Sequence, residues 1–171
     1  MKKVLFTICF MLVSVCMVAG GGDLKITKGK SSFLKDKASA TIVFDWSHAE
    51  WNNEESLQDH WGVEYDKLIM AGEEAFKEGF NENSKKLKIE NSNGKYRFEV
   101  KITNLDRFMS VMSFVPGHKH RVSGTIIVYN EETNEVICEF VADDLKGGRD
   151  FSIDDSYTEC MRDFGRDVAK Y

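Results

Sequence analysis

The strictest pattern in this 171-residue chain is an alternation of apolar and polar side chains that follows Asn93-Gly94, the dipeptide preferred in tight hairpin turns. Every second residue is apolar, namely Tyr96, Phe98, Val100 and Ile102. The residues between and beside them are charged or polar: Lys95, Arg97, Glu99, Lys101 and Thr103. Successive side chains of a strand point to opposite sides of its sheet, so this segment predicts a strand with one buried face and one solvent-exposed face. The buried face needs a covering layer.

Three other segments also predict strands. Residues 40–46 alternate with β-branched and aromatic enrichment, and Val122 to Val128 and Val136 to Ala142 supply two later core-facing sets. Glu131 to Asn134 supply a turn between the last two, so we expect these strands to pair as a hairpin. A further run, residues 108–115, alternates less cleanly.

Two segments have helical periodicity. Apolar residues three or four apart from Tyr65 onward predict an amphipathic helix that ends near Ser84. Gly72 and Gly79 lie on its apolar stripe, where each costs about 1 kcal/mol of helix propensity relative to Ala. Close approach of this helix to the sheet would offset that cost, and a kinked helix is the alternative. Residues 154–156 offer N-capping oxygens to a last helix, whose stripe is Tyr157, Cys160, Met161, Phe164 and Val168.

Strands that are polar on one face and helices that are apolar on one stripe predict an α+β fold in two layers, a mainly antiparallel sheet with two helices packed on one face. Pro116 is the only proline, and no repeat, linker or low-complexity tract follows the leader. We therefore expect residues 21–171 to form a single α+β domain.

Residues 1–20 predict a signal peptide. Lys2 and Lys3 precede an unbroken apolar run from Val4 to Ala19, and small residues follow from Gly20 onward. These are the parts of a secretory signal, and the run is short for a membrane span. We expect an exported chain, periplasmic or secreted, with no transmembrane span after cleavage.

The four cysteines bear on lipid anchoring and on redox state. Cys16 could be an acylated first residue, but Val15 stands where such signals carry Gly, Ala or Ser, so we do not expect anchoring by lipid. Cys9 and Cys16 leave with the leader, and only Cys138 and Cys160 reach an oxidising compartment. A disulfide between them would stabilise the fold by roughly 3 kcal/mol, and two buried free thiols are the equal alternative.

The charge of the exported chain excludes one class of partner. Without Lys2 and Lys3 the 23 basic residues become 21 against 28 acidic ones, so the net charge falls from −5 to −7. An acidic surface repels phosphate backbones, and nucleic acid is not an expected partner.

Three tryptophans gather in one short window with two histidines: Trp46, Trp51, Trp61, His48 and His60. Exposed indoles at Trp51 and Trp61 could stack on sugar rings, which would make a glycan-binding module. The structural interpretation is that a long loop between a strand and a helix is held in place by burying large aromatic rings.

Histidines also suggest a metal site. His118 and His120 could ligate a metal with His48 or His60, which would support a small metal-dependent hydrolase. An H-x-H pair fixes at most two ligands, so a solvated loop is the alternative. The sequence carries no G-x-S-x-G, no H-E-x-x-H and no phosphate-binding P-loop, and it indicates no cofactor.

Several short motifs resemble a family of small exported bacterial proteins of unknown function: residues 32–35, 42–47, 76–82, 124–130 and 146–149. More loosely, the hairpin that begins at Gly124 is similar to domains of cell-envelope accessory lipoproteins of the curli-secretion and penicillin-binding-protein-activator types. That resemblance implies an assembly or binding scaffold and supplies no site residue. The favoured hypothesis is an exported non-catalytic module that binds an envelope protein or a surface polymer.

Overall fold

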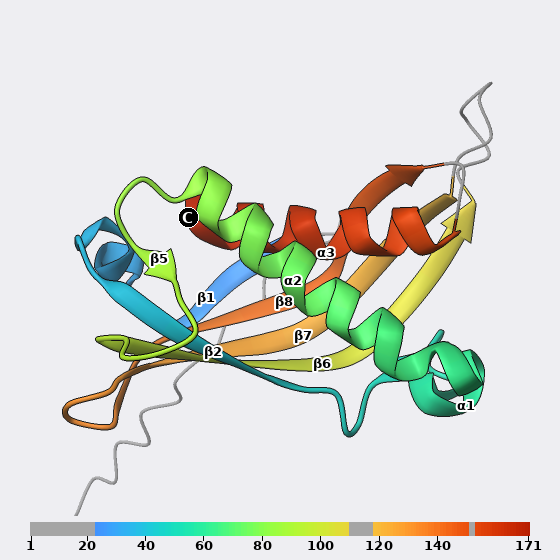
Figure 1. The fold of residues 1–171 in the computed structure, drawn as a ribbon, viewed down its shortest axis with the longest axis horizontal. Helices are drawn as coiled ribbons and strands as arrows, with labels where there is room; N and C mark the ends of the chain where they lie inside the picture. The colour runs from blue at the N-terminus through green and yellow to red at the C-terminus, as the bar shows by residue number, and fades with distance from the viewer. Residues whose placement is uncertain (1–22, 110–117, 151–152) are drawn as a thin grey trace, which may run out of the picture.

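The computed structural model describes residues 23–109, 118–150 and 153–171 (Figure 1). The α+β class is confirmed. The predicted signal peptide, Pro116 and most of the 108–115 run lie outside the described residues. The elements, in chain order, are β1 (Asp23–Gly29), the 3-10 helix η1 (Ser31–Lys35), β2 (Ser39–Asp45), β3 (Glu50–Trp51), β4 (Glu55–Ser56), α1 (Leu57–Trp61), the 3-10 helix η2 (Gly62–Glu64), α2 (Tyr65–Asn83), β5 (Lys88–Ile89), β6 (Tyr96–Met109), β7 (His118–Asn130), β8 (Glu135–Asp150) and α3 (Ile153–Lys170).

Within the described residues, eight strands form one mixed sheet. Six of them follow the order β1-β8-β7-β6-β2-β5, and off this path β3 pairs with β6 and with β4. The pairs β1·β8, β8·β7 and β7·β6 are antiparallel, and the expected hairpin of the last two strands is confirmed. β2 runs parallel to both β5 and β6, so the expectation of a mainly antiparallel sheet is only partly right. The reason is topological, because α2 stands between β2 and the later strands and returns the chain to the same end of the sheet.

The turn predicted at Asn93-Gly94 is not a hairpin turn. β5 and β6 lie on opposite sides of β2, and residues 90–95 carry the chain across it. The N–H of Glu90 donates to the carbonyl of Ala40 on the β5 side, at 2.8 Å. A Cβ at Gly94 would lie 2.5 Å from the backbone nitrogen of Thr41, so the crossing requires a residue without a side chain.

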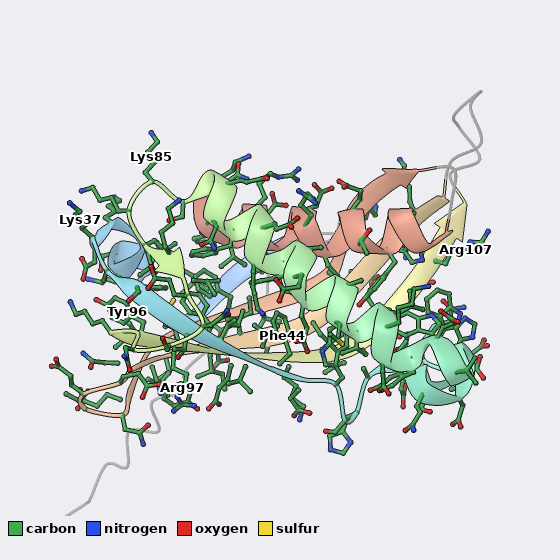
Figure 2. All side chains as sticks on the ribbon, in the orientation of Figure 1. Lys37, Phe44, Lys85, Tyr96, Arg97 and Arg107 are labelled. Carbon is green, nitrogen blue, oxygen red and sulfur yellow. The ribbon has the colours of Figure 1, made fainter. Side chains whose placement is uncertain are left out.

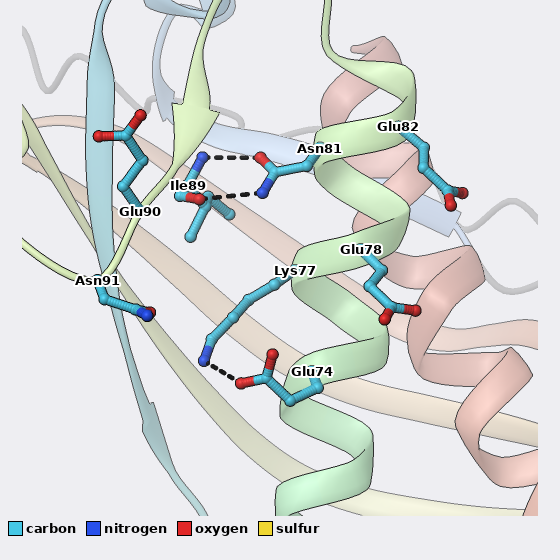
Figure 3. Close-up of a pocket in the computed structure, with 8 residues that line it drawn as sticks. All are labelled: Glu74, Lys77, Glu78, Asn81, Glu82, Ile89, Glu90 and Asn91. Atoms are coloured by element: carbon cyan, nitrogen blue, oxygen red, sulfur yellow. Dashed lines mark hydrogen bonds and ion pairs between the residues drawn. The ribbon is translucent and has the colours of Figure 1, made fainter.

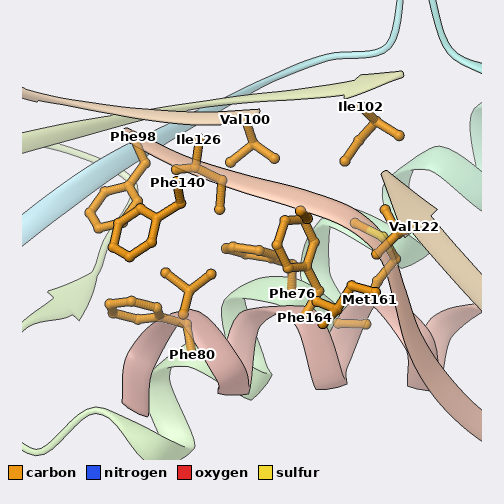
Figure 4. Packing of buried hydrophobic residues seen from close by; sticks show 14 of the residues in the cluster. Phe76, Phe80, Phe98, Val100, Ile102, Val122, Ile126, Phe140, Met161 and Phe164 are labelled. Atoms are coloured by element: carbon orange, nitrogen blue, oxygen red, sulfur yellow. The ribbon is translucent and has the colours of Figure 1, made fainter. Parts of the chain in front are cut away.

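The long helices α2 and α3 lie on the same side of the sheet (Figure 1). Figure 2 shows Phe44 between β2 and these helices, whereas Arg97 projects from the opposite side of the sheet. Val43, on that opposite side, is 55% exposed. The core between sheet and helices holds side chains that are at most 1% exposed, including Phe76, Phe80, Phe98, Val100, Ile102, Val122, Ile126, Phe140, Met161 and Phe164 (Figure 4).

The glycines of α2 do mark a close approach, but the partner is α3 and not the sheet. A Cβ at Gly79 would lie 2.0 Å from the carbonyl oxygen of Arg162, and one at Gly72 would lie 2.0 Å from the Tyr157 hydroxyl. Gly165 on α3 makes the corresponding contact with α2, because a Cβ there would lie 2.1 Å from the carbonyl oxygen of Phe76. The apolar stripe of α2 therefore packs at backbone distance on a second helix.

Cys138 and Cys160 are free and buried, so of the two alternatives the one with two free thiols holds. Cys160 faces Gly147 of β8, which is nine residues along the strand from Cys138. At about 3.3 Å per residue that separation is on the order of 30 Å, far beyond the reach of a disulfide. Burial raises the pKa of Cys138 to about 11 and that of Cys160 to about 12.

Candidate functional site

The tryptophans proposed for glycan stacking are packed against other rings. Trp51 is 7% exposed, and the ring of His60 stacks on it with centroids 4.2 Å apart. Trp61 is half-buried, with ring centroids 6.3 Å from Trp51 and 5.0 Å from Tyr157. Trp46 is also buried, and its Nε1 donates to Glu73 of α2 at 3.0 Å. This arrangement matches the interpretation in which the rings hold the loop between strand and helix in place.

Of the histidines proposed as metal ligands, the three whose side chains the structure describes do not form a metal site. Among the described residues there is no group of three or more His, Cys, Asp or Glu side chains that could hold a metal ion. His48 is exposed in the loop after β2, His60 is exposed on α1, and the side chain of His118 lies outside the described residues. His120 and Ser156 are fully buried, with Nδ1 and Oγ 2.9 Å apart. This pair ties β7 to α3 and presents no nucleophile to solvent.

A groove that the sequence did not reveal lies between α2 and the β5 end of the sheet (Figure 3). It is open to solvent and has a volume of about 720 Å³. Its lining is mostly acidic or amide: Glu74, Lys77, Glu78, Asn81, Glu82, Ile89, Glu90 and Asn91.

The helical wall of this groove carries a stripe of like charge. Glu74, Glu78 and Glu82 are spaced four residues apart and therefore share one face of α2. Like charges at that spacing destabilise a helix by about 0.2–0.5 kcal/mol per pair. Lys77 bonds Glu74 at 2.7 Å, and Arg162 of α3 bonds Glu78 at 2.6 Å and Glu82 at 3.5 Å. The three carboxylate side chains nevertheless remain 55–67% exposed, so the groove keeps an acidic wall.

The opposite wall is the end of the sheet, where a side chain takes the place of a strand. The N–H of Ile89 donates to Oδ1 of Asn81 at 2.8 Å, and Nδ2 of Asn81 donates to the Ile89 carbonyl at 2.9 Å (Figure 3). The outer edge of β5 is thus satisfied by an amide from α2. No further strand can pair there without displacing Asn81.

Past β5, the edge of β2 has no strand beside it in the described part of the chain. β5 pairs with β2 only at Ser39 and Ala40. The carbonyls of Ala38 and Ala40 point to the β5 side, where they accept from Lys88 and Glu90. Because backbone groups alternate along a strand, those of Ile42 and Phe44 face the same side, beyond the end of β5.

No family model matches this sequence, and no curated protein matches it. Among solved structures, the chain is similar to the PelC dodecamer from Paraburkholderia phytofirmans, at 10% identity over 86% of this chain and 96% of that chain, with a TM-score of 0.44. It is also similar to XCC0632 from Xanthomonas campestris, of the DUF330 family model, at 8% identity over 78% and 82% of the two chains, with a TM-score of 0.39. A minor lipoprotein from Acinetobacter baumannii matches at 11% identity over 78% and 87%, with a TM-score of 0.29. Likeness this weak transfers no function to the chain.

Proposed function

We propose that this protein is an exported, non-catalytic module that binds another protein in the groove between α2 and the β2–β5 edge of its sheet. The observation that carries the proposal is the juxtaposition of an unpaired strand edge with an acidic helix face. A strand edge offers backbone donors and acceptors that a polypeptide satisfies. Exposed carboxylates repel acidic polymers, so a protein is favoured over an acidic envelope polysaccharide as the occupant.

The groups in the groove are suited to recognition. They are four carboxylates, two amides, one lysine and one isoleucine, none of which is a serine, cysteine or histidine. Charge pairing and hydrogen bonding are what such a lining provides. The leader at residues 1–20 supports an exported location, and no helix in the described ranges is long and apolar enough to cross a membrane.

Site-specific photo-cross-linking in the native cell tests this proposal. A photoreactive residue is placed at Glu74 or Glu90 in the groove, or at Glu132 in the exposed β7–β8 turn as a control, in the full-length precursor. We expect a discrete cross-linked protein from the two groove positions and none from Glu132. The captured protein, once purified, should bind the wild-type module more tightly than the E74K and E90K variants.

Two results would overturn the proposal. Cross-linking that is equal at all three positions, or confined to Glu132, would remove the groove as the binding site. Turnover of a substrate by the purified protein would refute the non-catalytic assignment.

A further inference from the structure

We infer that the partner adds a short extended segment, rich in lysine or arginine, as a new strand beside Ile42–Phe44 of β2. This inference rests on the proposed function and names the class of partner. It is carried by the contrast between the sheet edges, by the rigidity of β2 and by the charge of the facing helix.

The two ends of the strand order, at β1 and at β5, are protected against pairing. β1, at one end of the sheet, has a register shift between Ile26 and Lys28 and carries an exposed Lys25, and such bulges and lysines are the usual means of blunting an edge. β5, at the other end, is capped by the side chain of Asn81. Ile42–Phe44 has no charged residue, no proline and no register shift against β6. Because this edge of β2 lacks the features that protect β1 and β5, it is available to pair with a strand of another chain.

The free edge is held rigid from the core side. Phe44 stacks on Trp46 with ring centroids 6.1 Å apart and meets Phe76 of α2 edge-on at 5.5 Å. The Trp46 indole is fixed in turn by its hydrogen bond to Glu73. Since the edge is already ordered, pairing with it costs little conformational entropy on this side of the interface. Ile42 and Phe44 each present one N–H and one C=O to an incoming strand.

The charge of the groove selects the sequence of that strand. An added strand would lie about 4.8 Å from β2, and its alternate side chains would point toward the helix-covered side of the sheet, where Glu74 projects from α2 toward β2 (Figure 3). Glu78 and Glu82 project toward α3, where Arg162 bonds them. Glu90 adds a second carboxylate to Glu74, at the β5 end. Basic side chains at alternate positions would meet these carboxylates. Among the described residues that line the groove, Lys77 is the one cation, and its charge opposes such a partner.

A peptide titration of the mature protein tests the inference. The probe is an eight-residue peptide of alternating lysine and valine, added up to about 1 mM, with amide hydrogen exchange followed by NMR. We expect the amides of Ile42 and Phe44 to exchange at least about tenfold more slowly when the peptide is bound, since both become hydrogen-bonded. The amide of Val43, which faces β6, should not change.

Matched peptides and variants separate backbone pairing from general charge attraction. A glutamate–valine peptide should not bind. N-methylation of the amides along the peptide edge that pairs with β2 should abolish binding, whereas N-methylation along the opposite edge should not. We expect K77M to bind the peptide about threefold more tightly and E74Q about threefold more weakly, because each changes one exposed charge in the groove. E132Q, in the β7–β8 turn, is the control and should not change the affinity.

Several outcomes would overturn strand addition: no slowing of amide exchange at Ile42 and Phe44, binding that is unaffected whichever edge of the peptide is N-methylated, or equal affinity for the glutamate peptide. If the amides of Ile42 and Phe44 exchange more slowly as the protein concentration rises in the absence of peptide, the occupant is a second copy of this chain. That result would also overturn the inference. If the peptide fails but Glu74 still cross-links a partner, strand addition is wrong and the proposed function stands. If both fail, both are wrong.

Discussion

Substitution of Gly79 by alanine tests the backbone-distance contact between α2 and α3. The added Cβ would lie 2.0 Å from the carbonyl oxygen of Arg162, a backbone atom that cannot rotate away. Ordinary contact begins near 3.4 Å, so the two helices would have to separate by about 1.4 Å at this point. Separation loosens the packing of Phe76 and Phe164, whose rings meet edge-on at 5.2 Å.

The magnitude follows from two opposing terms. Overpacking a well-packed core costs about 1–3 kcal/mol, and a clash with backbone belongs at the upper end of that range. Alanine regains about 1 kcal/mol of helix propensity over glycine. We therefore expect G79A to lower the free energy of unfolding by about 2 kcal/mol, which corresponds to a fall in Tm of about 4–8 °C for a domain of this size.

Urea denaturation of wild type and G79A, followed by circular dichroism, measures the difference. Met70 lies on the exposed face of the same helix, so M70A is the matched control and should stay within about 0.5 kcal/mol of wild type. G165A should show a comparable loss, and the double variant should lose less than the sum, because one separation of the helices relieves both clashes. A G79A protein as stable as wild type, or more stable, would refute the close contact.

Three further predictions concern the cysteines, a buried pair and a surface ion pair. In non-reduced native protein at about pH 8, Cys138 and Cys160 should not react with a thiol reagent, because burial raises their pKa values to about 11 and about 12. Both cysteines should react once the protein is unfolded, and fewer than two reactive thiols in the unfolded chain would contradict this prediction. S156A should lower the free energy of unfolding by about 1 kcal/mol through loss of the buried bond to His120, and an unchanged urea midpoint would count against that tie between β7 and α3. Hydrogen bonds from Tyr96 and Lys95 lower the pKa of the Asp36 carboxyl, so its stabilisation is present above the ordinary value of 3.8 and is lost as the pH falls through the lowered value. D36N should therefore be less stable than wild type by under about 1 kcal/mol at neutral pH, with the gap closing in acid, and a gap that widens in acid would show the sign to be wrong.

Elements with strong periodicity were predictable from the sequence. The helix expected from Tyr65 to near Ser84 is α2, and the apolar stripe expected for the last helix is buried along α3. The prediction of which alternate residues of β6 are buried is also confirmed, because Phe98, Val100 and Ile102 are at most 1% exposed. Each of these segments is long and has one face in the core, so its pattern is set by burial alone.

Long-range pairing was not predictable in the same way. β1 was missed because its strand alternates only at Leu24 and Ile26 and is otherwise polar, as suits an edge. Asn93-Gly94 has the chemistry of a hairpin turn, but tertiary structure uses the glycine for the crossing of β2. Cys138 and Cys160 do face one core, yet only the register of α3 along β8 shows how far apart they lie.

The acidic residues of α2 are the one trace of the groove in the sequence. Glu74, Glu78 and Glu82 repeat a like charge at the spacing that weakens a helix, which is a local cost without a local benefit. Such conflicts between local preference and fold are expected at functional sites. The free edge of β2 could not be inferred, because it depends on where β5 ends and on the cap supplied by Asn81.

Amide hydrogen exchange along β2 in the unliganded protein addresses the free edge directly. The amides of Ile42 and Phe44 should exchange nearly as fast as those of exposed loops, whereas those of Thr41 and Val43, which face β6, should be protected. Equal protection of all four amides would mean that this edge is already occupied, and it would contradict a binding site at β2.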